Sequence, residues 1–235
     1  MTRVRQLALD LASRPARARK DFYITQSNRM ALAQIDTWPN WPEGRMALIG
    51  PPGSGKTHLT NVWANRSEAQ ILRVVDLERF DPSALPTGAA VAVEDADLLP
   101  QLSSVGAAEE MLFHLCNRLH SQGGTLLVSG VEAPAHWPIR LPDLASRLGT
   151  AGVARLDAPD DELLSAVLMK LFADRQLEVS GEIIDFLLLR MERSFAAAEE
   201  VVGSLNRATI ATRRSITPRL VREVLDRFEE SHEVT

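Results

Sequence analysis

The residues most suited to chemistry are those at 50–57, GPPGSGKT. They satisfy the pattern G-x-x-x-x-G-K-[ST] through Gly50, Gly55, Lys56 and Thr57. Glycines here let backbone N–H groups surround phosphate oxygens, and the start of a following helix attracts negative charge. Lys56 reaches the β- and γ-phosphates, and the Thr57 hydroxyl coordinates Mg²⁺. We therefore expect ATP or ADP, with Mg²⁺, as the cofactor. The expected nucleotide-binding residues are Gly50, Pro51, Pro52, Gly53, Ser54, Gly55, Lys56, Thr57 and His58.

A second candidate site is the sequence VAVEDAD, in which Glu94 and Asp95 follow an apolar run. Nucleotide hydrolysis needs a carboxylate near Mg²⁺ and a base that orients water. By position, Glu94 is the expected magnesium partner and Asp95 the expected base. Glutamate is longer than aspartate by one methylene, so this order displaces both groups by on the order of 1 Å and slows hydrolysis by about 10²-fold. We expect a cation site with slow intrinsic hydrolysis; the alternative is that both acids only end a strand. Asp97 is expected to be a surface acid.

A polar residue also ends the apolar run GTLLVS, where Ser129 is the last residue. In this position it faces the region of the γ-phosphate. We expect Ser129 to contact phosphate or water; the alternative is that it only caps the strand.

Short apolar runs separated by helical patterns must position these residues. The runs predict a mostly parallel, five-stranded sheet between helices, because strands buried on both faces are continuously apolar. A helix before the first strand is expected to have Ser27 or Asn28 as its cap. The predicted strands are 45–49, 71–75, 90–94, 124–129 and 152–156, and the predicted helices are 27–35, 57–65 and 106–120.

The composition changes after Pro159, where no strand pattern remains. Asp160 and Thr217 are plausible helix caps, and Pro218 suits a first helical position. The predicted helices are 160–175, 181–193, 195–213 and 217–228. We therefore expect a flexible tail over 1–17, an α/β domain over 18–158 and a small all-helical domain over 159–235.

The overall composition is that of an ordinary globular protein: of 235 residues, 45% are hydrophobic and 24% charged, with a net charge of -5. The negative charge argues against a dedicated nucleic-acid binder, so we expect no direct sequence-specific DNA binding. Cys116 is the only cysteine, which excludes a disulfide framework and fits a reducing cytoplasm. No apolar run reaches about 18 residues, so we expect a cytoplasmic protein that does not enter a membrane.

The order of these parts resembles an AAA+ module: a phosphate loop, an acidic strand end, a polar strand end and an arginine before a helical lid. Over roughly residues 20–228 the chain resembles the DnaA family of replication initiators. The stretches that carry this resemblance are FYITQSNRMAL, AAEEMLFHLCNRLHSQGGTLLVSG, LPDLASRLG and GSLNRATIATRRSITPRLVREVL. A DnaA initiator has a helix-turn-helix DNA-binding domain after its lid. This chain ends at Thr235, so we expect that domain to be absent.

The tail sequence QLALDL resembles the sliding-clamp-binding peptide of bacterial replication proteins. In an extended chain Leu7, Leu9 and Leu11 enter an apolar pocket, and burying each of them stabilises binding by roughly 1.5–3 kcal/mol. The Gln6 amide forms hydrogen bonds. The alternative is the start of an ordinary amphipathic helix. A DnaA-like body joined to such a tail is similar to the Hda family of DnaA-homologous regulators.

This resemblance implies a nucleotide-bound protein that docks on the DNA polymerase III sliding clamp and makes ATP-bound DnaA hydrolyse its ATP. Arg147 in LASRLG matches the family's arginine finger, which acts on a neighbour's nucleotide; the alternative is an ion pair with Asp143. Adenine contacts are implied for Phe22, Tyr23 and Ile24.

Family members that sense their nucleotide carry a lid arginine where this chain has Glu199, so the sensor is shifted or absent and we favour ADP. The expected oligomeric state is a monomer or a nucleotide-dependent homo-oligomer. The alternatives for function are a helicase-loader-like ATPase that depends on its own turnover, and an adaptor that sequesters DnaA without catalysis.

Overall fold

The computed structural model describes residues 23–212 and 216–232. The expected clamp-binding residues Gln6, Leu7, Leu9 and Leu11, and the expected adenine contact Phe22, lie outside the described residues.

The centre of the fold is a five-stranded sheet in the order β2-β3-β4-β1-β5, in which every neighbouring pair is parallel. This confirms the predicted sheet. The strands are β1 (Arg45–Ile49), β2 (Gln70–Arg73), β3 (Ala90–Glu94), β4 (Thr125–Gly130) and β5 (Gly152–Arg155). The strand predicted over 71–75 ends early, because Val74 and Leu77 turn into the core within a 3-10 helix.

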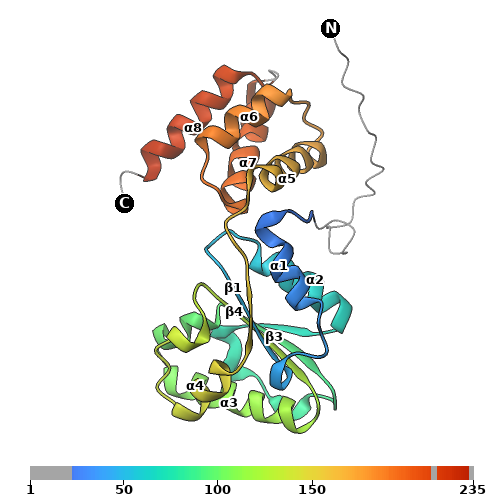
Figure 1. Cartoon of the computed structure of the whole chain (residues 1–235). Coiled ribbons are helices and arrows are strands. Elements are labelled where there is room, and N and C mark those ends of the chain that lie inside the picture. The colour runs from blue at the N-terminus through green and yellow to red at the C-terminus, as the bar shows by residue number, and fades with distance from the viewer. Residues whose placement is uncertain (1–22, 213–215, 233–235) are drawn as a thin grey trace.

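Helices cover both faces of the sheet, as Figure 1 shows. Side chains of successive strand residues point to opposite faces, so Ala47 and Ile49 join one apolar cluster while Met46 and Leu48 join the other. The first cluster packs against α3 (Val105–Ser121) and α4 (Pro142–Gly149), and the second against α1 (Gln26–Ile35) and α2 (Lys56–Ser67). Short 3-10 helices are η2 (Pro42–Gly44), η3 (Val74–Arg79), η4 (Pro82–Ala84), η5 (Ala96–Gln101) and η6 (Pro134–His136).

Four further helices form a separate bundle at the top of Figure 1, here called the lid. They enclose a third apolar cluster with members such as Phe172, Leu187 and Leu205. The helices are α5 (Asp161–Asp174), α6 (Gly181–Arg190), α7 (Phe195–Thr212) and α8 (Pro218–His232).

Helix ends show where the local sequence determined the structure and where it did not. Asp160 caps α5 as predicted, since its Oδ1 accepts a hydrogen bond from the Leu163 N–H at 2.9 Å. The cap of α1 is Thr25, and the predicted caps Ser27 and Asn28 lie inside the helix. Asn28 instead turns its side chain back to the chain before α1, with Oδ1 accepting from the Thr25 N–H at 3.0 Å. The helix predicted over 181–193 ends at Arg190, because the chain then turns to start α7.

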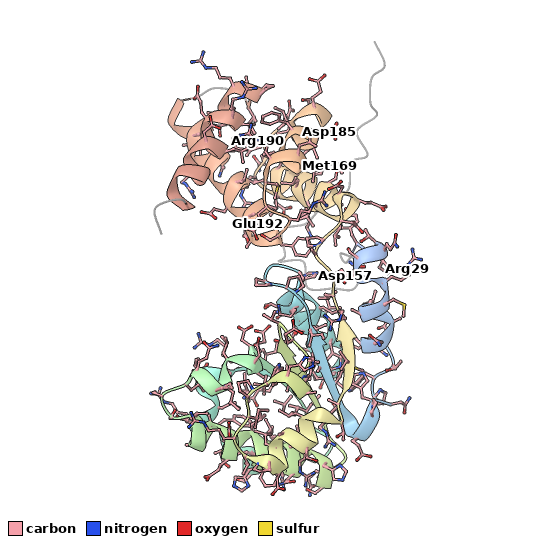
Figure 2. All side chains as sticks on the ribbon, turned by 60° about the vertical axis from the view of Figure 1, so that its left-hand side comes forward. Arg29, Asp157, Met169, Asp185, Arg190 and Glu192 are labelled. Atoms are coloured by element: carbon pink, nitrogen blue, oxygen red, sulfur yellow. The ribbon has the colours of Figure 1, made fainter. Side chains whose placement is uncertain are left out.

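The segment that leads from β5 to the lid runs beside the start of α1. The Asp157 N–H donates to the Ser27 carbonyl at 3.2 Å, and the Ser27 N–H donates to the Asp160 carboxylate at 3.2 Å. Figure 2 shows Asp157 and Arg29 of α1 at this level, between the sheet and the lid. These contacts fix the start of the lid to the domain that carries the phosphate loop.

Candidate nucleotide site

The phosphate loop, residues 50–57, joins β1 to α2 at the carboxyl edge of the sheet. Gly53 and Gly55 have φ of 71° and 95°, a backbone conformation that glycine adopts without strain. The ammonium group of Lys56 donates to the carbonyls of Gly50 at 2.7 Å and Pro51 at 3.1 Å. The loop therefore curls around its own lysine, as a phosphate cradle requires.

A cleft of 780 Å³ opens in front of this loop. It is called the phosphate cleft below, and its lining comes from the loop, from the ends of β3 and β4, and from the start of α7. The pKa of Lys56 is lowered by burial, an effect that the negative charges of Asp95 and Asp97 partly offset. The lining residues are Pro52, Gly53, Gly55, Lys56, Thr57, His58, Asn61, Asp95, Asp97, Leu98, Val131, Phe195, Ala196 and Glu199.

Glu94 and Thr57 meet behind this cleft. Burial raises the pKa of Glu94, and a hydrogen bond from the Thr57 side chain partly offsets that rise. The Oε1 atom of Glu94 is buried and has no hydrogen-bond partner. A buried carboxylate oxygen beside a threonine hydroxyl suits Mg²⁺, which proteins hold through one or two oxygen ligands plus the phosphates of a nucleotide. The structure thus brings together the two side chains expected to hold the metal.

Asp95 is held by Ser129 through its backbone. The Asp95 N–H donates to the Ser129 Oγ at 3.0 Å, and Ser129 is buried. Asp95 has a φ of 55°, which an aspartate tolerates better than most residues. Ser129 lies on β4, between β1 and β3, so it links the acidic strand end to the neighbouring strand. The contact observed for Ser129 is therefore with Asp95 and not with the open cleft.

The prediction for Asp97 was wrong. Asp97 is half-buried and lines the phosphate cleft, and its Oδ2 accepts a hydrogen bond from the Val131 N–H at 2.8 Å. Its charge acts on Lys56 together with that of Asp95. The 3-10 helix η5 returns the chain toward β4 directly after β3, and this turn brings Asp97 inward.

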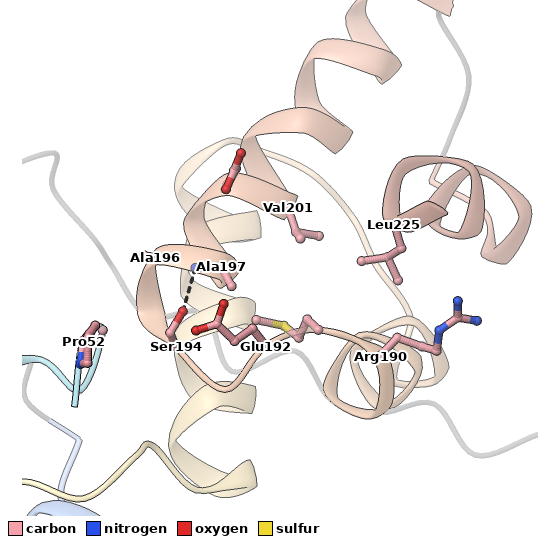
Figure 3. Close-up of a pocket in the computed structure, with 11 residues that line it drawn as sticks. Pro52, Arg190, Glu192, Ser194, Ala196, Ala197, Val201 and Leu225 are labelled. Atoms are coloured by element: carbon pink, nitrogen blue, oxygen red, sulfur yellow. Dashed lines mark hydrogen bonds between the residues drawn. The ribbon is translucent and has the colours of Figure 1, made fainter. Parts of the chain in front are cut away.

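The lid touches the phosphate loop. The Phe195 N–H donates to the Gly53 carbonyl at 3.1 Å, and the Phe195 ring lies so close to Gly55 that an added Cβ would meet it at 2.8 Å. A Cβ on Gly53 would meet the Ser194 Cβ at 2.4 Å. Figure 3 shows Ser194 at the start of α7, where its Oγ accepts from the Ala197 N–H at 3.0 Å, with Pro52 of the loop nearby. Glycine is therefore required where α7 approaches the loop.

Glu199 occupies the position at which a lid arginine was considered. It lines the phosphate cleft from α7, and its Oε1 lies 4.0 Å from Nη2 of Arg175. The nearest upstream arginine, Arg193, instead pairs with Asp161 at 2.8 Å and does not line the cleft. Among the described residues, the lining of this cleft includes acids and one lysine but no arginine.

The other predicted nucleotide contacts are only partly gathered at the cleft. His58 lines it, whereas Tyr23 and Ile24 are 46% and 54% exposed and do not. Gly50, Pro51 and Ser54 lie within the loop but outside the lining. Ser54 is buried, and its Oγ has no hydrogen-bond partner.

Arg147 lies on α4 in a different pocket of 540 Å³, called the arginine pocket below. The pocket is lined by Glu43, Arg45, Phe113, Asp143, Ser146, Arg147 and Thr150, none of which lines the phosphate cleft. The Arg147 guanidinium lies 5.4 Å from the centre of the Phe113 ring. Within the described ranges, no carboxylate is in ion-pair distance of Arg147, so the alternative pair with Asp143 is not formed.

The segment that precedes α4 is held in place by a residue for which the sequence predicted no role. Glu109 on α3 is buried, and its two carboxylate oxygens accept hydrogen bonds from the N–H groups of Arg140 at 3.0 Å and Leu141 at 2.8 Å. Because a buried carboxylate needs such donors, this contact ties the helix that carries Arg147 to α3.

Comparison with known proteins places the fold. No family model matches the chain. An uncharacterized protein of Haemophilus influenzae is 29% identical over 185 residues, covering 76% of this chain and 80% of that protein. Domain III of the Thermotoga maritima replication initiation protein DnaA has a TM-score of 0.76 at 18% identity and covers 93% of this chain and 99% of that structure. AMPPCP-bound DnaA from Aquifex aeolicus has a TM-score of 0.67 at 16% identity, with 94% and 70% covered. The chain therefore has the DnaA-like AAA+ fold that the sequence predicted.

The described residues contain neither a membrane-spanning helix nor a metal cluster built from protein side chains alone. No helix in this part of the chain is both long and apolar enough to cross a bilayer. Among the side chains that the structure describes, in 23–210 and 216–226, no three His, Cys, Asp or Glu are grouped in a way that would hold a metal ion by themselves. A magnesium ion at Thr57 and Glu94 would thus need the oxygens of a nucleotide as further ligands.

Proposed function

We propose that this chain is a nucleotide-bound AAA+ regulator of replication initiation that stimulates ATP hydrolysis on DnaA in trans. The observation that carries the proposal is the separation of Arg147 from the chain's own phosphate cleft. Arg147 shares its pocket with Arg45, the first residue of β1, whereas the phosphate loop follows the last residue of that strand. A strand of this length spans roughly 13 Å at about 3.3 Å per residue, and this separation supports a role for Arg147 on a neighbouring molecule.

The nucleotide is assigned to the phosphate cleft. Lys56, the glycines of the loop, and the Glu94–Thr57 pair fit the phosphates and Mg²⁺ of ADP or ATP. A DnaA structure of the same fold holds AMPPCP, which supports this assignment. Glu199 would repel a γ-phosphate, and so we assign ADP as the resident nucleotide.

Arg147 is assigned the role of an arginine finger. A guanidinium supplied in trans stabilises the charge on a transferring phosphoryl group and contributes about 10³–10⁵ in rate. Asp95 is assigned as the base of the chain's own slow hydrolysis, and Ser129 is assigned the positioning of Asp95.

A tether to the sliding clamp completes the proposal. The tail residues Gln6, Leu7, Leu9 and Leu11 form the binding peptide, which raises the local concentration of the regulator at DNA that carries a clamp. We further propose a cytoplasmic protein that binds no specific DNA sequence and acts as a monomer or a nucleotide-dependent homo-oligomer.

The experiment is to load DnaA with labelled ATP and to follow hydrolysis after adding this protein, ADP and clamp loaded on DNA. We expect hydrolysis to accelerate, and the acceleration to fall when Leu9 and Leu11 are changed to alanine. The same double variant should no longer be captured by immobilised clamp. If labelled ATP on DnaA is unchanged, the trans role is rejected.

A second function follows from the acids in the cleft. Asp95 and Asp97 both act electrostatically on Lys56, an arrangement suited to hydrolysis of the chain's own ATP, as in a helicase-loader-like ATPase. That function predicts appreciable turnover by the chain alone that is lost in Lys56→Ala. A third function, sequestration of DnaA without catalysis, predicts inhibition that survives Arg147→Ala.

A further inference from the structure

Arg45 is a buried charged residue without a counter-ion. It is the first residue of β1, and only 6% of it is exposed. Its Nη2 donates to the Thr150 Oγ1 at 3.2 Å, but its Nε and Nη1 are buried and have no hydrogen-bond partner. Leaving two donors of a buried guanidinium unsatisfied is strongly unfavourable unless something else binds there.

Arg147 brings a second positive charge to the same pocket. The Thr150 hydroxyl that accepts from Arg45 donates in turn to the Arg147 carbonyl at 2.9 Å, which ties Arg45 to the end of α4. Both guanidinium charges act on the buried Cys116 thiol, whose pKa burial raises to about 11 while the two arginines lower it. The two arginines therefore line one pocket from two elements, β1 and α4.

The two carboxylates that line the pocket do not form ion pairs with these arginines. Asp143 and Glu43 line the pocket, but no carboxylate of the described residues is in ion-pair distance of Arg45 or Arg147. The Oε2 atom of Glu43 lies 3.9 Å from Nδ1 of His120. Two arginines therefore line this pocket, and neither has an ion-pair partner among the described residues.

We propose that the arginine pocket binds a phosphoryl oxyanion between Arg45 and Arg147. A phosphoryl group carries up to two negative charges and matches two guanidinium groups, whereas a carboxylate carries one. The planar donor fork of arginine fits the oxygens of such a group, and the Ser146 hydroxyl on the rim adds a further donor.

This inference concerns the isolated chain and does not depend on the proposed trans activity. The phosphoryl group has two possible sources, free phosphate and a nucleotide held by a partner. If Arg147 completes the site of a partner, Arg45 becomes the second cation that the partner's phosphate meets.

The first arm of the test is a titration of the isolated full chain with inorganic phosphate at constant ionic strength, read by calorimetry and by the unfolding midpoint. All variants in this arm carry Lys56→Ala, so that the phosphate loop contributes little to the measured phosphate binding. Adding Arg45→Met is expected to weaken phosphate binding by at least about tenfold. In phosphate-free buffer the same change should leave the unfolding midpoint equal or raise it, because methionine removes the unsatisfied donors.

The matched control is Arg219→Met, which removes the same charge from a side chain that is 90% exposed and lies on α8. It should leave phosphate affinity within about twofold of that of Lys56→Ala alone, since an exposed charge contributes little. Equal phosphate binding with and without Arg45, or an Arg45→Met variant that is destabilised to the same extent at every phosphate concentration, would overturn the proposal. The latter result would assign Arg45 to structural support of α4 alone.

The second arm separates the two sources of phosphate. Arg45→Met, with Lys56 intact, is added to DnaA that carries labelled ATP. Loss of both phosphate binding and stimulation assigns the pocket to the partner's nucleotide. Loss of phosphate binding with full stimulation assigns it to free phosphate. Failure of the wild-type chain to stimulate DnaA would reject the proposed function. The phosphate site would then be tested by the phosphate titration of the first arm alone.

Discussion

Under the proposed function, Glu94 is the side chain that holds Mg²⁺ beside the phosphate cleft. Its pKa is raised by burial, so its folded-state pKa lies above its unfolded value. A carboxyl group of this kind favours the folded state when protonated, and that stabilising effect is lost as the pH rises through the folded pKa. Ionised Glu94 therefore lowers the stability of the folded state, and under the proposed function bound Mg²⁺ would offset this effect.

Glu94→Gln follows directly from this reasoning. Without Mg²⁺ at neutral pH, the variant should unfold at a higher temperature than the wild type, and the difference should shrink as the pH is lowered through the raised pKa of Glu94. The variant should also bind ADP with little dependence on Mg²⁺. Thermal unfolding in a chelator and ADP titrations with and without Mg²⁺ measure both effects. A variant that is less stable at neutral pH and keeps the full Mg²⁺ dependence would show that Glu94 only ends its strand.

Under the proposed function, Glu199 favours ADP over ATP. It faces the phosphate cleft from α7, where its charge opposes an additional phosphate. Glu199→Arg should raise the affinity for ATP relative to ADP by roughly fivefold, because an exposed ion pair contributes up to about 1 kcal/mol. Glu200→Arg is the control, since Glu200 lines the adjoining pocket and does not line the phosphate cleft itself. Equal changes in both variants would attribute the effect to overall charge.

At the scale of elements, α7 contacts the phosphate loop, and this contact would couple the lid to a nucleotide bound there. Gly53 and Gly88 have similar φ values of 71° and 74°, but an added Cβ meets Ser194 at 2.4 Å in the first case and nothing within 4 Å in the second. Alanine at either position strains the backbone by about 1–2 kcal/mol. Only Gly53→Ala should, in addition, push α7 away from the loop.

The measurement for this pair is hydrogen exchange across α7 together with the rate of ADP release. We expect Gly53→Ala to speed exchange at the start of α7 and to speed ADP release, whereas Gly88→Ala lowers stability without either effect. Matching behaviour of the two variants would mean that the lid does not depend on this approach.

The elements also show how far the sequence predicted the site. The five strands were predictable because a parallel strand buried on both faces is apolar throughout, as in the run Ala90–Glu94. The helix α4 was not predicted, although Pro142 at its start and the spacing of Leu144 and Leu148 fit a helix. Asp97 was misplaced because its inward direction depends on the turn η5 after β3.

Burial of a side chain by elements that are distant in the sequence could not be predicted from local sequence patterns. Arg45 begins an apolar strand and would be an ordinary polar end residue if α4 did not cover it. Glu109 lies within an amphipathic helix, and only the chain entering α4 gives its carboxylate two backbone donors. Neither contact is encoded in local spacing.

At the scale of the whole molecule, the sheet separates the two pockets to which we assign phosphate groups. The phosphate cleft lies at the carboxyl edge beneath the lid, and the arginine pocket lies at the amino edge between β1, α3 and α4. In Figure 1 the lid is at the top, with α3 and α4 at the opposite end. A molecule built in this way can hold one nucleotide while presenting arginines to another.

The most direct test of this account compares Arg147→Ala with the wild type on DnaA that carries labelled ATP, in the presence of ADP and loaded clamp. The account predicts that Arg147→Ala binds ADP as tightly as the wild type and loses stimulation by about 10³-fold or more. Undiminished stimulation by Arg147→Ala, with ADP binding intact, would contradict the central claim that this arginine completes a partner's site.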